Sequence, residues 1–182
     1  LDPASGETRW TRSTGEKFVL DMRFSPDGAR LAVTHSNASP LPGNLNAGMS
    51  GGLQLLDTAT GTVVWSEAHQ PGLLAVPTFS RDGKRLAVTK ATTSYTAVPA
   101  LSLQLLEAET GGEIWTAATG GIAFFTAFSP DGQRLFMSLW RFPHPSAPSS
   151  LCCWDVQDHR QLWSVDRSHS SMLSLSGDGR QL

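Results

Sequence analysis

Two adjacent cysteines, Cys152 and Cys153, carry the most reactive side chains in this chain. Oxidation of neighbouring thiols would close a strained disulfide ring, and such a ring would be a redox-active group. The pair lies in the stretch Leu-Cys-Cys-Trp-Asp, which reads as a β-strand. Because successive side chains of a strand point to opposite faces, the two sulfurs are expected to diverge and to remain free. We therefore expect structural roles, with Cys153 as a small buried apolar side chain.

The histidines form no pattern typical of a catalytic or metal site. None of the five lies at metal-ligand spacing from another histidine or from the cysteines. The sequence also contains no nucleophile elbow, no phosphate-binding glycine loop and no zinc-protease helix motif. We therefore expect no catalytic residue, no metal and no cofactor, and a protein that is not an enzyme.

Four aspartates recur in one motif, Ser-x-Asp-Gly, and are separated by 55, 49 and 47 residues. In such a turn the aspartate hydrogen-bonds the backbone through its side chain and the glycine accepts positive φ. One aspartate per repeat does not make a catalytic pair, so these positions are predicted to be structural. The turn residues are Asp27, Gly28, Asp82, Gly83, Asp131 and Gly132, followed by Asp178 in a fourth copy.

A second element interleaves with the first and ends on tryptophan. An acidic residue is followed four residues later by glycine and four residues after that by tryptophan; a fourth copy lacks the glycine. The tryptophans are separated by 55, 50 and 48 residues, so two independent markers share one period. This periodicity predicts that they pack between repeats. They are Trp10, Trp65, Trp115 and Trp163.

The elements that would position these residues are short strands. Residues 18–24 alternate apolar and polar side chains, and the tight turn that follows returns the chain through residues 30–35. A third and a fourth strand follow at residues 53–57 and 62–65. Four-stranded antiparallel units at a period of roughly 40–50 residues predict an all-β chain, a β-propeller segment with essentially no helix.

The repeat divides the chain into five parts, and both ends interrupt a repeat, so we expect a piece of a larger propeller. We expect three complete blades between two partial ones. The predicted parts are residues 1–15 (last strands of a preceding blade), 16–67, 68–117 and 118–165 (blades), and 166–182 (start of a truncated blade).

Composition excludes two classes of partner. The formal net charge is -2, from 14 basic and 16 acidic side chains, so the electrostatic signature of a nucleic-acid-binding protein is missing. No apolar run approaches the roughly 20 residues that a helix needs to span a bilayer. We expect no nucleic-acid partner and no membrane insertion.

The turns resemble those of known propellers. Phe-Ser-Pro-Asp-Gly-x-Arg-Leu-Ala at residues 24–32, with near copies at 79–87 and 128–136, resembles the first hairpin of bacterial WD-repeat blades, and Trp154-Asp155 is a literal Trp-Asp dipeptide. The resemblance implies a scaffold that binds proteins or peptides and packs against further blades of a parent propeller.

Another family shares the second element. The stretch from Asp57 to Trp65 is similar to the tryptophan-docking motif of quinoprotein-type propellers. That family includes alcohol dehydrogenases with pyrroloquinoline quinone, some with a vicinal disulfide over the cofactor, and non-enzymatic envelope scaffolds. The Ser-Pro-Asp-Gly hairpins are foreign to it, so we favour the WD-like interpretation. The alternative is the propeller of a quinoprotein dehydrogenase or of a hydrolase.

A partner surface is predicted at the end of the blades that carries the long connections. The first and third turns of each blade are tight, whereas the second connection is long, at residues 36–52, 91–100 and 140–150. Binding residues concentrate in long loops on rigid scaffolds, and Trp and Arg are enriched at interface hot spots. The candidate partner-binding residues are Lys90, Tyr95, Trp140, Arg141, Phe142 and His144.

Overall fold

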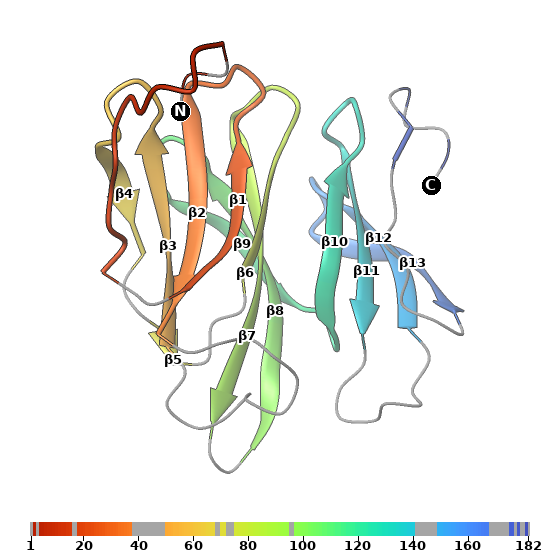
Figure 1. The fold of residues 1–182 in the computed structure, drawn as a ribbon. Helices are drawn as coiled ribbons and strands as arrows, with labels where there is room; N and C mark the ends of the chain where they lie inside the picture. The colour runs from red at the N-terminus through yellow and green to blue at the C-terminus, as the bar shows by residue number, and fades with distance from the viewer. Residues whose placement is uncertain are drawn as a thin grey trace.

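A computed structural model of the chain shows three antiparallel sheets standing side by side (Figure 1). It describes residues 2, 4–15, 18–37, 50–67, 70–71, 75–94, 97–140, 149–167, 175–176, 178 and 181. This part of the chain contains no helix. The predicted all-β architecture of four-stranded antiparallel blades is therefore confirmed.

Each blade is a meander in which consecutive strands are neighbours. The first blade comprises β1 (Phe18–Phe24), β2 (Arg30–Ser36), β3 (Ser50–Asp57) and β4 (Val63–Ser66). It also includes the two-residue strand β5 (Gln70–Pro71), which pairs with β3. The second comprises β6 (Ala75–Phe79), β7 (Arg85–Ser94), β8 (Ala97–Glu107) and β9 (Glu113–Ala118). The third comprises β10 (Ile122–Phe128), β11 (Arg134–Trp140), β12 (Ser149–Asp155) and β13 (Arg160–Arg167).

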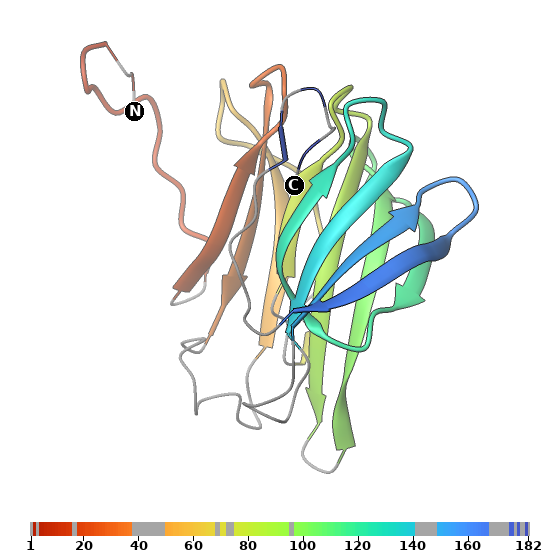
Figure 2. The same cartoon turned by 90° about the vertical axis from the view of Figure 1, so that its right-hand side faces the viewer.

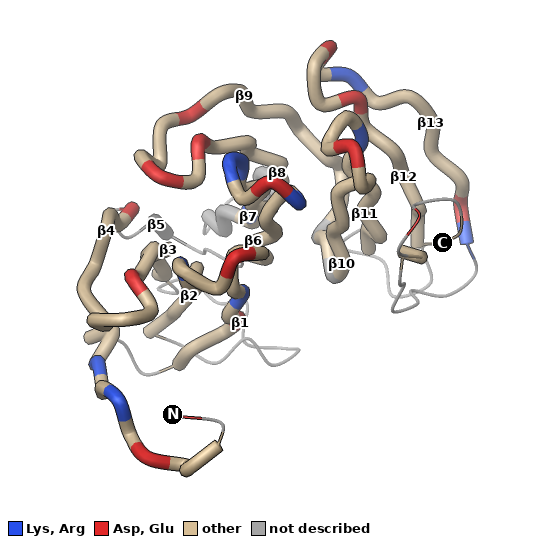
Figure 3. Tube along the Cα trace, turned by 90° about the horizontal axis from the view of Figure 1, so that it is seen from above, with Lys and Arg blue, Asp and Glu red and all other residues tan. Residues whose placement is uncertain are grey.

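The blades are arranged like a fan. Viewed from above, the first strands β1, β6 and β10 lie on the inner side of an arc, and the fourth strands β4, β9 and β13 lie on its outer side (Figure 3). The inner strands of adjacent blades contact each other, and Thr78 of β6 hydrogen-bonds Thr126 of β10. The tight turns of the three blades gather at one end of the sheets (Figure 2). We call this end the turn end.

The second connection of the second blade differs from the prediction. Residues 91–100 were expected to form a long loop, but β7 and β8 continue through them and remain paired as far as Ser94 and Ala97. The stretch is rich in threonine and also contains valine, residues that favour strands. The expected loop is therefore wrong for most of this segment.

The N-terminal segment lies beside the first blade without a strand among its described residues. It nevertheless forms the same turn as the later repeats, because Gly6 N donates to Asp2 O at 2.7 Å, as Gly61 N does to Asp57 O at 2.8 Å. Its assignment to a preceding blade remains a prediction. The predicted start of a truncated blade at residues 166–182 falls largely outside the described residues.

The hydrophobic core lies between the sheets, in separate clusters. One cluster joins β2 and β3 of the first blade to β7 and β8 of the second, including Leu53, Leu55 and Leu86, which are fully buried. A second joins the second blade to the third through Leu103, Leu135 and their neighbours. Burial of apolar area is therefore shared between blades, and a blade separated from its neighbour would expose its face to water.

The tryptophans of the second element lie at the blade boundaries. Nε1 of Trp10 donates to Thr58 O at 2.7 Å, and Nε1 of Trp65 donates to Ala108 O at 2.8 Å. Trp115 repeats this contact with Val156 O at 3.2 Å. Each indole thus hydrogen-bonds the turn that joins the third and fourth strands of the following blade. Trp163 differs, since it is 37% exposed and lies beside Phe136 of its own blade.

The glycine of the second element makes room for the indole. A Cβ atom on Gly111 would lie 2.8 Å from Cδ2 of Trp65, and one on Gly61 would lie 2.7 Å from the same atom of Trp10. Both glycines also have φ near +71°. At the third boundary His159 occupies this position with φ of 57°, and its ring stacks on Trp115 with 5.3 Å between ring centroids.

The two cysteines are buried, free thiols in β12. Cys152 packs in the cluster shared with the second blade, whereas Cys153 is not part of it. Burial raises the pKa of the Cys153 thiol, which disfavours the reactive thiolate. The placement fits the predicted structural role.

Replacement of Trp115 by alanine is expected to lower the free energy of unfolding by about 3–5 kcal/mol, because the side chain is 7% exposed and seals a blade boundary. Trp163→Ala, in the same position of the repeat but more exposed, is the matched control and should cost less. Urea unfolding of both variants measures the difference. Equal losses would show that the boundary contact does not matter.

Replacement of Gly111 by alanine should destabilise the fold by more than Gly132→Ala does. Both positions have positive φ, which costs an alanine roughly 1–2 kcal/mol. Only at Gly111 would the new methyl group also clash with an indole, because the space around Gly132 is open. Thermal unfolding of the two variants isolates the contact with Trp65. The contact contributes nothing if the two melting temperatures fall equally.

Candidate functional site

The predicted partner-binding residues fall only partly within the described chain. Lys90 lies in β7 with its side chain 10% exposed, and its ammonium group pairs with the Glu67 carboxylate. Trp140 is the last residue of β11 and is half-buried. Tyr95, Arg141, Phe142 and His144 lie outside the described residues.

The predicted turn residues lie together at the turn end, one set per blade. In each hairpin the serine Oγ donates to the aspartate Oδ1 at 2.5–2.6 Å and accepts from the arginine N at 2.9–3.0 Å. The aspartate also accepts from the backbone N–H two residues further on. For Asp27, Asp82 and Asp131 alike, the serine hydrogen bond is the main cause of a pKa below the ordinary value.

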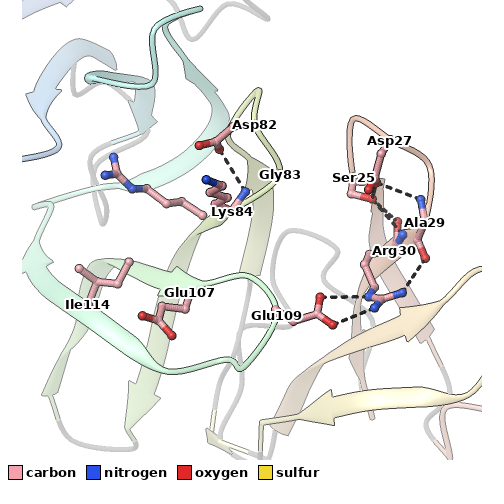
Figure 4. Close-up of a pocket in the computed structure, with 11 residues that line it drawn as sticks. Ser25, Asp27, Ala29, Arg30, Asp82, Gly83, Lys84, Glu107, Glu109 and Ile114 are labelled. Carbon is pink, nitrogen blue, oxygen red and sulfur yellow. Dashed lines mark hydrogen bonds and ion pairs between the residues drawn. The ribbon is translucent and has the colours of Figure 1, made fainter.

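The turn end is grooved between the first and second blades. A groove of about 610 Å³ lies there, and most of the residues that line it are polar or charged (Figure 4). From the first blade come Ser25, Asp27, Ala29 and Arg30. From the second come Asp82, Gly83, Lys84, Arg85, Glu107, Glu109 and Ile114.

One arginine bridges this groove. Nη2 and Nε of Arg30 donate to the two carboxylate oxygens of Glu109 at 2.8 and 3.2 Å, and Nη1 donates to Asp57 at 2.9 Å. The first partner belongs to the next blade, and the second belongs to the same blade. The contact with Arg30 lowers the pKa of Glu109, and the hydrogen bond with Glu109 raises the pKa of Arg30. Arg30 is therefore held by two carboxylates.

A second groove of about 430 Å³ lies between the second and third blades. Its charged residues include Arg85. Apolar atoms come from Leu105, Ile114 and Val156. The remaining lining residues are Asp131, Gly132, Gln133, Gln157 and His159. The two grooves share Arg85 and Ile114, so they flank the same part of the second blade.

The described part of the chain contains no candidate metal site and no membrane-spanning helix. No group of three histidine, cysteine, aspartate or glutamate side chains with the geometry to hold a metal ion occurs in this part of the chain. Across the same residues, no helix is long and apolar enough to cross a bilayer.

The family of the chain is decided by residues 49–182, which match the family model described as outer membrane protein assembly factor BamB. The chain belongs to this family. No curated protein matches the sequence. The resemblances to WD-repeat and quinoprotein turns remain predictions, whereas the bacterial-type propeller fold is confirmed.

Solved structures of similar fold are propellers and enzymes. Hydrazine synthase of Kuenenia stuttgartiensis is similar with a TM-score of 0.63 and 20% identity, over 87% of this chain and 53% of that one. TolB of Acinetobacter baumannii has a TM-score of 0.56 and 21% identity, over 90% and 36%. The acylaminoacyl peptidase of Pyrococcus horikoshii has 0.58 and 12%, over 89% and 27%. The chain thus spans about a quarter to a half of these proteins, and at such identities the likeness concerns the fold alone.

Sequence reasoning missed the charged groups of the turn end. Arg30 and Arg85 each stand three residues after a turn aspartate, and Glu109 stands two residues after the acidic residue of the second element. The arginine recurs at this offset in all three blades, as Arg30, Arg85 and Arg134, whereas Ala59 and Gln157 stand at the position of Glu109 in the other two blades. The sequence does not show that Arg30 and Glu109 are neighbours in space, since they come from different blades.

Replacement of Ser80 by alanine should lower the free energy of unfolding by about 1–2 kcal/mol at pH 7, since a buried hydroxyl with three hydrogen bonds is lost. The pKa of Asp82 is depressed in the folded state, so its stabilisation is present above the unfolded pKa of about 4 and disappears as pH falls through the folded value. The variant should therefore lose less stability than the parent between pH 5 and pH 2.5.

Urea unfolding at the two pH values measures this, with Ser66→Ala at an exposed position of β4 as control. Identical pH dependence in the Ser80 variant and the parent would contradict the role given to the hydroxyl.

Proposed function

We propose that this chain is part of a non-catalytic propeller that binds a protein partner during the assembly of outer membrane proteins. The observation that carries the proposal is the match of residues 49–182 to an assembly-factor family. The fold supports it, because blades packed on buried leucine clusters form a rigid scaffold that can present loops to a partner without a conformational change. The partner is a protein, because assembly requires contact with the proteins that are assembled.

The proposed contact surface is the end of the blades opposite the turn end. Trp140 lies at the last position of β11, and Arg141, Phe142 and His144 follow it in the sequence. An arginine and two aromatic residues next to prolines are the composition expected of an interface hot spot. Lys90 contributes less, because its charge is already paired with Glu67.

Site-specific photocrosslinking tests this surface. A photoreactive amino acid at position 142 should yield a crosslink to a component or client of the outer-membrane assembly machinery, whereas one at position 64, on the exposed face of β4, should not. The identified partner is then purified, and its affinity for the parent, for Phe142→Ala and for Val64→Ala is compared. We expect at least a tenfold loss for Phe142→Ala only, as for a truncated hot spot.

Two outcomes would contradict the proposal. Equal affinities of all three proteins would remove the surface from the interaction. Reduction of a dye in the presence of an alcohol and added pyrroloquinoline quinone would instead favour a dehydrogenase.

A further inference from the structure

Arg30 and Arg85 occupy the same position of the repeat but differ in their partners. Both follow the Ser-x-Asp-Gly turn and open the second strand of their blade. Arg30 is held by Asp57 and by both oxygens of Glu109. For Arg85, the side-chain hydrogen bond among the described residues is a long one of 3.4 Å from Nη1 to Gly132 O, beside a minor electrostatic interaction with Asp82. No ion pair of Arg85 occurs in that part of the chain.

Two sequence differences account for the contrast. Gln157 stands in the third blade where Glu109 stands in the second, so the neighbouring blade offers Arg85 an amide instead of a carboxylate. Glu107 lies opposite Arg85 in the strand register, as Asp57 lies opposite Arg30. Its carboxylate accepts the Thr110 hydroxyl at 2.9 Å and forms no ion pair with Arg85 among the described residues. The guanidinium of Arg30 is therefore paired at the boundary between the first and second blades, whereas that of Arg85 is available at the boundary between the second and third.

The surroundings of Arg85 suit a peptide better than a small inorganic anion. The groove between the second and third blades has a volume of about 430 Å³, and Ile114, which is 41% exposed, forms part of its apolar lining with Leu105. Gln133 and Gln157 add neutral amide groups. Asp131 is the carboxylate of this lining, and it is already engaged by the Ser129 hydroxyl and by the backbone of its own turn.

One wall of the groove is rigid. His159 adopts positive φ, an uncommon conformation for a residue other than glycine, and its ring lies against Trp115. Trp115 in turn stacks against Trp154, with 6.3 Å between ring centroids. Three rings from two blades thus pack in series, and one of them, His159, lines the groove, so a ligand would meet a preorganised surface there.

We propose that this groove binds an acidic side chain of a partner peptide. The glutamate or aspartate of the peptide would sit on Arg85 as Glu109 sits on Arg30, with an adjacent apolar side chain against Ile114. The chain itself supplies the template for this contact, because the two hydrogen bonds between Arg30 and Glu109 show how a carboxylate is received at a blade boundary. The site lies at the turn end, so it is separate from the surface proposed above.

The probe for the test is the capped peptide N-acetyl-Ala-Leu-Glu-Leu-Ala-amide, titrated into the isotope-labelled chain and followed by NMR. We expect shifts at the Arg85 guanidinium and at the Gln133 and Gln157 side-chain amides. The same peptide with glutamine in place of glutamate should bind at least tenfold more weakly, since it loses a charge-assisted contact. The glutamine peptide with a free C-terminal carboxylate distinguishes a chain end from a side chain and should also bind weakly.

Matched variants follow from the repeat. Arg85→Gln should weaken binding of the glutamate peptide about tenfold or more, whereas Arg30→Gln should leave it unchanged. Gln157→Glu keeps Arg85 but gives the neighbouring blade the carboxylate that Glu109 supplies to Arg30. This carboxylate should pair with Arg85, so the variant should weaken peptide binding as much as Arg85→Gln does. Glu109→Gln should open the equivalent site at Arg30 and add a second set of shifts between the first and second blades.

The result that would overturn the proposal is equally specific. Shifts that are the same for the glutamate and glutamine peptides, or that persist in Arg85→Gln and Gln157→Glu, would show that Arg85 is not the anchor. Absence of binding to the parent chain would have the same consequence. The thermal unfolding of each variant verifies that the surface substitutions leave the blades folded.

Discussion

The hydrogen bond from an indole N–H to a backbone carbonyl of the next blade is the contact on which the arrangement of the sheets depends. It occurs at three successive boundaries, from Trp10, Trp65 and Trp115. At two of them a glycine with positive φ lies against the ring, at a distance that no side chain would tolerate. The polar end of the indole is thereby satisfied while its rings bury apolar surface, as buried tryptophan requires. The indole contacts thus define how adjacent blades meet, and the leucine-rich clusters pack next to them.

The two ends of the blades have different physical characters. At the turn end the connections are short and closely hydrogen-bonded, and they carry many charged residues (Figure 3). One groove lies there between the first and second blades (Figure 4), and another lies between the second and third. Away from the turn end, the ammonium group of Lys90 is paired with the carboxylate of Glu67. The sheets separate the two surfaces proposed above, so binding at one end would need no contact with the other.

Much of the fold could be predicted from the residues alone. The first strand of the first blade was expected at residues 18–24 and is observed as Phe18–Phe24, because alternating apolar residues and a Pro-Asp-Gly turn leave few alternatives. Residues 91–100 were predicted incorrectly, since a polar, threonine-rich stretch is compatible with both a loop and an extended strand pair. The pairing of Arg30 with Glu109 could not be predicted, because it depends on which blades are neighbours and on the rotation between them. The same holds for Arg85, whose availability becomes visible only by comparison with Arg30.

The spacing of the docking contacts has a consequence for how the chain assembles. The three indole hydrogen bonds connect residues 48, 43 and 41 positions apart. The entropy lost on closing a loop grows only with the logarithm of its length, so each closure costs the chain nearly the same. A nascent chain therefore meets no single closure that is much harder than the others. Each tryptophan precedes its acceptor in the sequence. The docking contact of a new blade can therefore form as soon as the turn between its third and fourth strands has formed.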